Sequence, residues 1–129
     1  MSSSKATHYN DTPIEKWNAA HFQAYLQDQH VERYGIQYAS AGSVVAERNL
    51  IAKYIGTVRR PGMYSKETLK AFIDACFTQY SPTQQYPGIN FWFMTTYMLR
   101  LLQQAELASK RAEAEREATD NIEEVAEWL

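Results

Sequence analysis

The sequence predicts an all-α fold, a small four-helix domain with a long, partly projecting C-terminal helix and a short acidic terminal helix. Apolar residues recur at helical spacing in four segments, and helix-capping residues stand at the starts of the first three. No segment has the pattern of a sheet, and the length of 129 residues suits one domain. We therefore expect the chain to divide into a mobile N-terminal arm (1–12), a helical domain (13–102), a charged helical extension (103–118) and an acidic amphipathic tail (119–129).

The first helix is predicted over 13–32. Thr12 is the expected N-cap, Pro13 suits the first helical position, and Glu15 completes a Thr-x-x-Glu capping box. The helix should end before Gly35. Its apolar stripe consists of Ile14, Trp17, Phe22 and Tyr25 or Leu26. The segment that follows has too few periodic residues for a helix, and Ile36 and Tyr38 are expected in a short extended piece under the core.

Two further helices are predicted over 43–55 and 66–80. Ser43 and Ser65 precede them as N-caps, and Gly56 is the expected C′ residue of the first. The helix over 66–80 has the most regular periodicity in the chain. Its apolar face consists of Leu69, Phe72, Ile73, Cys76, Phe77 and Tyr80.

The segment "YPGINFWFMTTYMLRLL" (86–102) is the most apolar in the chain, and it predicts a fourth helix over 90–118. Because the first part of this helix is apolar on nearly all sides, we expect it to be buried on all sides as the centre of the bundle. A membrane-spanning helix needs about 20 apolar residues. This run is shorter and is interrupted by Asn90, Thr95, Thr96 and Arg100, so no membrane segment is expected.

Charge is distributed unevenly along the chain. Ten Lys and Arg residues face seven Asp and Glu residues up to Leu102, whereas three face eight from Gln103 onward. A mildly basic body with an acidic tail allows the body to bind a polyanion, while the tail serves as a separate ligand or an autoinhibitory cover.

The sequence contains no pattern typical of catalysis. Its histidines have no metal-ligand spacing, there is no Gly-rich phosphate loop, and Cys76 lies on an apolar helix face where a thiol is usually core. We expect a non-enzymatic protein without cofactor or metal. A single cysteine rules out an intrachain disulfide and favours the cytoplasm, the host cytoplasm included if the protein comes from a phage.

A basic turn is the first candidate binding site. Lys53, Arg59, Arg60 and Lys66 gather around a helix junction together with Tyr64, and exposed cations with tyrosines can bind a nucleic-acid backbone. The alternative, which the small number of cations favours, is a solvated turn that keeps the protein soluble.

The loop "YSPTQQYPGINFW" is the second candidate, because its two tyrosines and Trp92 could form an aromatic contact patch. We prefer the alternative that Tyr86 and Trp92 cover the end of the bundle.

The C-terminus is the third candidate. Ile122, Val125, Trp128 and Leu129 alternate with acids, as in an amphipathic helix that binds a partner's groove. The tail could equally fold back on the body. The helix over 103–118 would carry it about 24 Å away.

The first hundred residues resemble small helical accessory proteins that bacteriophages encode in replication or transcription-control modules. The resemblance rests on Trp17, Phe22, Tyr25 and Leu26, on "RYGIQY" (33–38), and on "FIDACF" and "YSPTQQYPG" within 72–88. It implies nucleic acid, or a polymerase, helicase or loader, as the partner.

These observations favour a non-catalytic adaptor in nucleic-acid metabolism. In this hypothesis the Lys53–Lys66 surface contacts phosphate and the acidic tail binds a protein. The alternative is a structural or assembly protein that forms oligomers through its C-terminal helix, where Ala105, Ala108 and Ala112 form a line.

Overall fold

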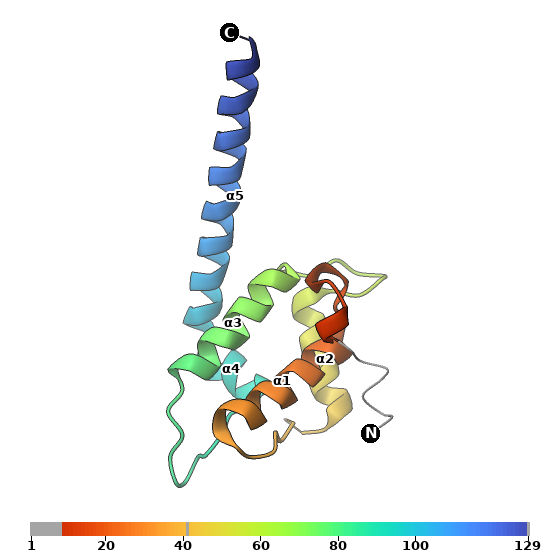
Figure 1. The fold of residues 1–129 in the computed structure, drawn as a ribbon. Helices are drawn as coiled ribbons and strands as arrows, with labels where there is room; N and C mark the ends of the chain where they lie inside the picture. The colour runs from red at the N-terminus through yellow and green to blue at the C-terminus, as the bar shows by residue number, and fades with distance from the viewer. Residues whose placement is uncertain (1–8, 41, 129) are drawn as a thin grey trace.

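The computed structural model describes residues 9–40 and 42–128, with side chains up to residue 122. These residues form five α-helices and no strand, which confirms the all-α prediction (Figure 1). The elements are the 3-10 turns η2 (Tyr9–Asp11) and η3 (Ile14–Lys16), followed by α1 (Ala19–Tyr34), α2 (Val44–Ile55), α3 (Lys66–Gln79), α4 (Phe91–Tyr97) and α5 (Leu99–Trp128).

The start of the first helix differs from the prediction. The helix begins at Ala19, and its cap is Asn18, which exchanges hydrogen bonds with His21 in a capping box. The predicted box at Thr12 and Glu15 is wrong. The chain makes a 3-10 turn there, so that the Trp17 ring enters the core at 4% exposure and its indole N–H donates to the Thr12 carbonyl (2.9 Å).

Part of the predicted N-terminal arm packs on the body. Residues 1–8 lie outside the described residues, but Tyr9 packs edge-on against Trp17 and Tyr25, with ring centroids 5.4 and 5.3 Å away. Its hydroxyl donates to Asp28 (2.6 Å). Residues 9–12 are therefore attached to the body by Tyr9, which was predicted to belong to the mobile arm.

The core lies among α1, α2, α3, α4 and the first turns of α5, as Figure 1 shows. The predicted faces of α2 and α3 are buried there because serine caps and apolar spacing agree at both helices. The largest fully buried apolar side chains are Phe22, Leu26, Ile51, Leu69, Phe72, Ile73, Phe91, Met94 and Leu102.

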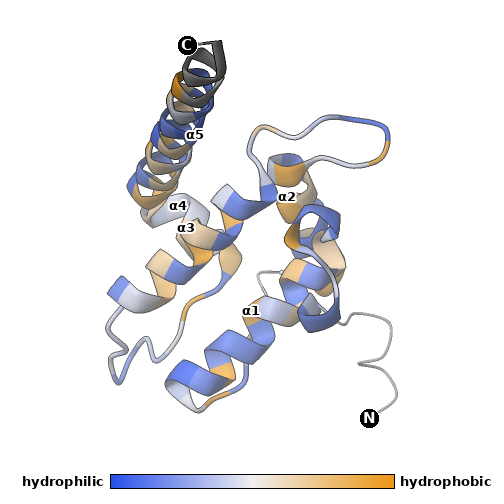
Figure 2. Ribbon diagram, turned by 45° about the horizontal axis from the view of Figure 1, so that its top comes forward, coloured by the Kyte–Doolittle hydropathy of each residue, from blue (hydrophilic) through white to orange (hydrophobic). Residues whose placement is uncertain are grey.

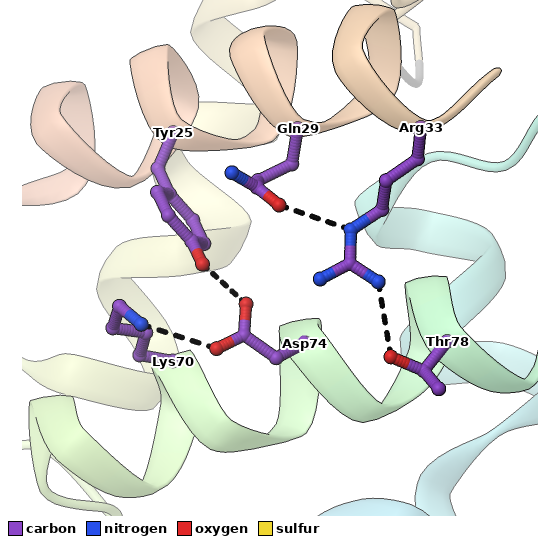
Figure 3. A network of polar contacts seen from close by, with 6 residues as sticks. All are labelled: Tyr25, Gln29, Arg33, Lys70, Asp74 and Thr78. Atoms are coloured by element: carbon purple, nitrogen blue, oxygen red, sulfur yellow. Dashed lines mark hydrogen bonds and ion pairs between the residues drawn. The ribbon is translucent and has the colours of Figure 1, made fainter.

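A polar network joins α1 to α3 along their outer edge (Figure 3). The Tyr25 hydroxyl donates to Asp74, which also accepts from Lys70 (3.1 Å). Arg33, two turns after Tyr25 on α1, donates to Thr78, one turn after Asp74 on α3 (3.0 Å). In the sequence, Asp74 lies four residues after Lys70 on the polar face of its helix, a spacing typical of a solvated ion pair. It also binds a largely buried tyrosine and so helps to fix how α1 lies on α3.

The carboxylate of Glu47 is buried at 1% exposure in the middle of the body. It accepts from Gln23 Nε2 of α1 (3.3 Å) and from the hydroxyl of Tyr38 in the segment after α1. The same hydroxyl accepts from the backbone N–H of Phe91 (2.9 Å) at the start of α4. One carboxylate thus connects α1, α2, α4 and the segment between the first two helices.

The predicted fourth helix is broken. Its first part, α4, ends at Tyr97, and Met98 has a non-helical backbone (φ −123°, ψ 23°) before α5 begins. Thr95 donates its hydroxyl to the carbonyls of Phe91 and Trp92 (both 3.1 Å). Such bonds from Thr weaken and bend helices, and the neighbouring β-branched Thr96 adds to this.

The expectation that this segment is buried on all sides is also wrong. Phe91 and Met94 are fully buried, but Trp92 is 49% and Tyr97 66% exposed. The segment has one core face and one aromatic outer face.

The helix α5 packs on α3 through Leu101 and Leu102 and then leaves the body (Figure 1). Every described residue from 110 to 122 is exposed. The helix continues to Trp128, so the tail predicted to be a separate terminal helix is its extension. In the described part of the chain, no helix is both apolar and long enough to cross a membrane.

Removing the Tyr38 hydroxyl should destabilise the protein. The variant Tyr38→Phe loses one bond to a buried carboxylate and the acceptor of the Phe91 amide, so we expect it to lower the free energy of unfolding by about 2–3 kcal/mol in urea denaturation. The control, Tyr97→Phe at an exposed ring, should change it by less than about 0.5 kcal/mol. Equal stability of the two variants would show that the Glu47 contacts do not stabilise the fold.

Several tyrosines should resist ionisation in the folded state. Burial, reinforced by Asp74 and Glu47 respectively, raises the pKa of Tyr25 and Tyr38, and burial raises the pKa of Tyr34 to about 12. Folding therefore favours the neutral phenol over the phenolate. The stability that these tyrosines contribute is complete below their unfolded pKa of about 10, and it is lost as the pH rises from there through the higher pKa of the folded state. Tyrosinate absorbance at pH 10.5 should be lower in native than in urea-unfolded protein. Identical titration curves for the two states are the contrary result.

Candidate functional site

The loop between α2 and α3 is a tight hairpin that begins and ends with glycine. Thr57 and Arg60 exchange backbone hydrogen bonds (2.8 and 3.3 Å). Gly56 has φ +85°, and a Cβ on Gly62 would lie 2.2 Å from the Ile55 carbonyl carbon. Both positions therefore require glycine. Because its two ends lie close together, the loop projects from the helices, as Figure 2 shows. Val58 in this loop is completely exposed.

Three of the five predicted nucleic-acid contacts meet at this hairpin. Lys53 and Arg60 line one hollow of about 390 Å³, and Arg59 is exposed at the tip. None of the eight described residues that line the hollow is acidic. We call Lys53, Arg59 and Arg60 the hairpin surface.

The other two predicted contacts have partners within the protein. Tyr64 is half-buried and stacks on Tyr54 with centroids 6.0 Å apart. Lys66 donates to the Glu15 carbonyl (3.2 Å), away from the hollow. The proposed surface is therefore smaller than the sequence suggested, with three cations and no tyrosine.

Cys76 and His21 have structural roles. Burial raises the pKa of the Cys76 thiol to about 12, which suppresses the reactive thiolate. His21 caps α1, and burial together with the nearby Lys66 charge lowers its pKa. In the described residues no three His, Cys, Asp or Glu side chains are placed to hold a metal ion.

A second hollow, of about 430 Å³, lies between the segment after α1 and the loop before α4. Aromatic and aliphatic side chains dominate its lining, which includes Tyr86 and Trp92. The preferred prediction for these two side chains is that they cover the end of the bundle. They are instead 61% and 49% exposed, and they form the wall of a hollow. The buried His30 at this hollow was not identified from the sequence, because Phe77 and Gly88, which are distant in the sequence, complete the contacts around its ring.

The C-terminal candidate is only partly described. Ile122 lies on the exposed part of α5 with 70% of its surface accessible. The side chains of Val125, Trp128 and Leu129 lie outside the described residues. What the structure shows is that the helical backbone carries this end away from the body as far as Trp128 (Figure 1).

Comparison of the chain with protein-family models, curated proteins and solved structures found no match.

Proposed function

We propose that the protein is a non-catalytic adaptor in nucleic-acid metabolism. In this proposal the hairpin surface contacts phosphate groups, and the far end of α5 binds a protein partner. The observation that supports it best is the hollow shared by Lys53 and Arg60, whose described lining contains no acid to neutralise them. Exposed cations free of acidic neighbours are the groups that bind a phosphate backbone.

The length of α5 supports two separate roles. Its 30 residues correspond to about 45 Å at 1.5 Å per residue. A partner at the acidic end would therefore leave the hairpin surface accessible. Acidic residues outnumber basic residues eight to three from Gln103 onward. This balance disfavours phosphate binding along α5 and leaves the hairpin as the nucleic-acid contact.

Binding to nucleic acid should be weak, independent of sequence and sensitive to salt. Three phosphate contacts predict a slope of about −2.7 for log K against log[salt] on duplex DNA, from about −0.9 for each contact. The double variant Arg59→Ala with Arg60→Ala should reduce the slope to about −0.9. Fluorescence anisotropy with two unrelated 20-mers over a series of NaCl concentrations measures both quantities.

The matched control removes the same charge from α5, by Arg111→Ala with Arg116→Ala, and should leave the slope unchanged. Affinity that does not depend on salt would refute the phosphate contact, as would equal losses in the two double variants.

A second candidate function is assembly of several copies through α5, and an exposed, partly apolar face of this helix supports it. Leu107, Ala114, Ala118 and Ile122 lie on one face of α5, which also carries Arg111, and Leu107 and Ile122 are 50% and 70% exposed. This stripe differs from the predicted line of alanines, in which Ala105 is half-buried toward the body.

The assembly function predicts that Ala118→Glu abolishes oligomers, because it places a charge in the stripe without lowering helix propensity much. Light scattering should then give the monomer mass for Ala118→Glu and a multiple of it for the wild type. Ala112→Glu, the same change on another face of α5, is the control and should behave as the wild type. A monomeric wild type at about 100 µM would exclude this function.

A further inference from the structure

The outer face of α4 carries a row of aromatic rings that contact one another. The ring centroid of Phe93 lies 5.6 Å from that of Tyr80, which follows α3, and 4.9 Å from that of Tyr97. The Trp92 ring joins the row at Tyr97, at a centroid distance of 6.0 Å. At the other end, the ring of Tyr34 on α1 lies 6.2 Å from that of Tyr80. We call these five residues the aromatic row.

The core does not use the exposed end of the aromatic row. Phe91 and Met94 supply the fully buried side chains of α4. Trp92 and Tyr97 lie on the outer face of this helix, and they are 49% and 66% exposed. Two large rings in contact with each other at the surface form a contiguous apolar patch, and such a patch marks a surface that binds another molecule.

The aromatic row lies in a part of the chain that has no acidic residue. No Asp or Glu occurs between residues 75 and 105. Trp92 and Tyr97 each line a hollow, and none of the described residues that line these two hollows is acidic. Arg100 is exposed and lines the same hollow as Tyr97. A polyanion that approaches these rings therefore has a cation beside it and no acid among the described lining residues.

A second cation lies at the Tyr34 end of the aromatic row. Arg33 is exposed, and its guanidinium carbon lies 5.7 Å from the centroid of the Phe77 ring, which contacts Tyr34. The acid next to it in the sequence is Glu32. Burial raises the pKa of Tyr9 and the charge of Glu32 adds to this, so Glu32 lies on the side of α1 that holds η2. The aromatic row therefore has an arginine at each end.

Single-stranded nucleic acid fits this combination of groups. Unpaired bases stack on aromatic side chains with little dependence on sequence, and cations beside the rings bind the phosphates. In a duplex the faces of the bases are covered by neighbouring base pairs, so the rings could not stack on them. Phosphates account for the arginines and bases account for the rings, whereas an apolar protein partner would account for the rings alone.

We propose that the aromatic row binds single-stranded nucleic acid, with bases stacked on Trp92 and Tyr97 and a phosphate at Arg100. This inference rests on the proposed function and names its substrate, because the hairpin surface contacts the phosphates of any nucleic acid whereas the aromatic row requires unpaired bases. The two surfaces lie at opposite ends of α3, whose 14 residues span about 21 Å (Figure 2). A strand of about 20 nucleotides is long enough to contact both.

The first test separates the contribution of bases from that of phosphates. Fluorescence anisotropy at low salt compares the binding of the full-length protein to a 20-mer of thymidine and to an abasic 20-mer, which has the same phosphates and no bases. Stacking on the exposed rings predicts that the thymidine strand binds about fivefold more tightly or better. Equal affinities for the two strands, or no binding to either, would overturn the proposal.

A second test removes one ring at a time. Tyr97→Leu keeps an apolar side chain at an exposed position but has no ring, so it should weaken binding of the thymidine strand about fivefold or more and leave binding of a 20-bp duplex unchanged. Trp92→Leu should show the same loss. The control Leu107→Ala changes an exposed apolar side chain of α5 and should bind both as the wild type does. Wild-type affinity of both ring variants for the thymidine strand would overturn the proposal and leave a protein partner as the occupant of the rings.

The hairpin variant, Arg59→Ala with Arg60→Ala, separates this inference from the proposed function. It should weaken binding of the duplex and of the thymidine strand, because both carry phosphates. If it weakens both while Tyr97→Leu weakens neither, the hairpin contact holds and the aromatic row is not a binding site. If it binds as the wild type does while Tyr97→Leu loses the thymidine strand, the aromatic row is the binding site and the hairpin contact is refuted.

Discussion

The body of this protein depends on how one buried carboxylate is satisfied. Burying a carboxylate is costly unless hydrogen bonds replace its water, and removing one partner of such a group typically costs more than an ordinary hydrogen bond contributes. Glu47 receives donors from Gln23 and Tyr38. Arg48 donates to the other end of the Gln23 amide (2.9 Å), which fixes the orientation of that side chain. These hydrogen bonds hold α1 and α2 in one relative position. Each bond depends on the others, because the buried carboxylate of Glu47 needs its donors and Gln23 needs a fixed orientation.

The same network determines what the surface can offer. Tyr38 accepts from the Phe91 amide at the start of α4, so the position of α4 and of its exposed aromatic face follows from the Glu47 contacts. Tyr38 also contacts His30. The hollow lined by His30 and Trp92 therefore depends on the carboxylate network, whereas the hairpin surface rests on two glycines and α5 on its packing against α3. Each of the three surfaces has a separate structural basis.

The parts of the fold that could be predicted from the sequence are those that neighbouring residues determine, such as helix caps and apolar spacing. Serine caps and apolar spacing place α2 and α3 within one residue of their observed ends. The predicted cap at Thr12 is wrong because the chain makes a 3-10 turn there and buries Trp17. The burial of Trp17 depends on residues of the whole core and has no local signal in the sequence. The break at Met98 has no glycine or proline to signal it. Glu47 did have a signal, because it lies four residues before Ile51 on the apolar face of α2. A charge there predicts a buried partner, but Gln23 and Tyr38 can be identified only from the folded chain.

The most direct test of this account is native-state hydrogen exchange at the Phe91 amide, which donates to Tyr38 rather than to a helical carbonyl. If the Glu47 network fixes α4, this amide should be protected nearly as well as core amides of α3. In Glu47→Gln, which weakens the bond to Tyr38 but keeps the size of the side chain, it should lose at least tenfold in protection while α3 keeps its own. Rapid exchange of the Phe91 amide in the wild type, or unchanged protection in Glu47→Gln, would contradict the central role of the buried carboxylate.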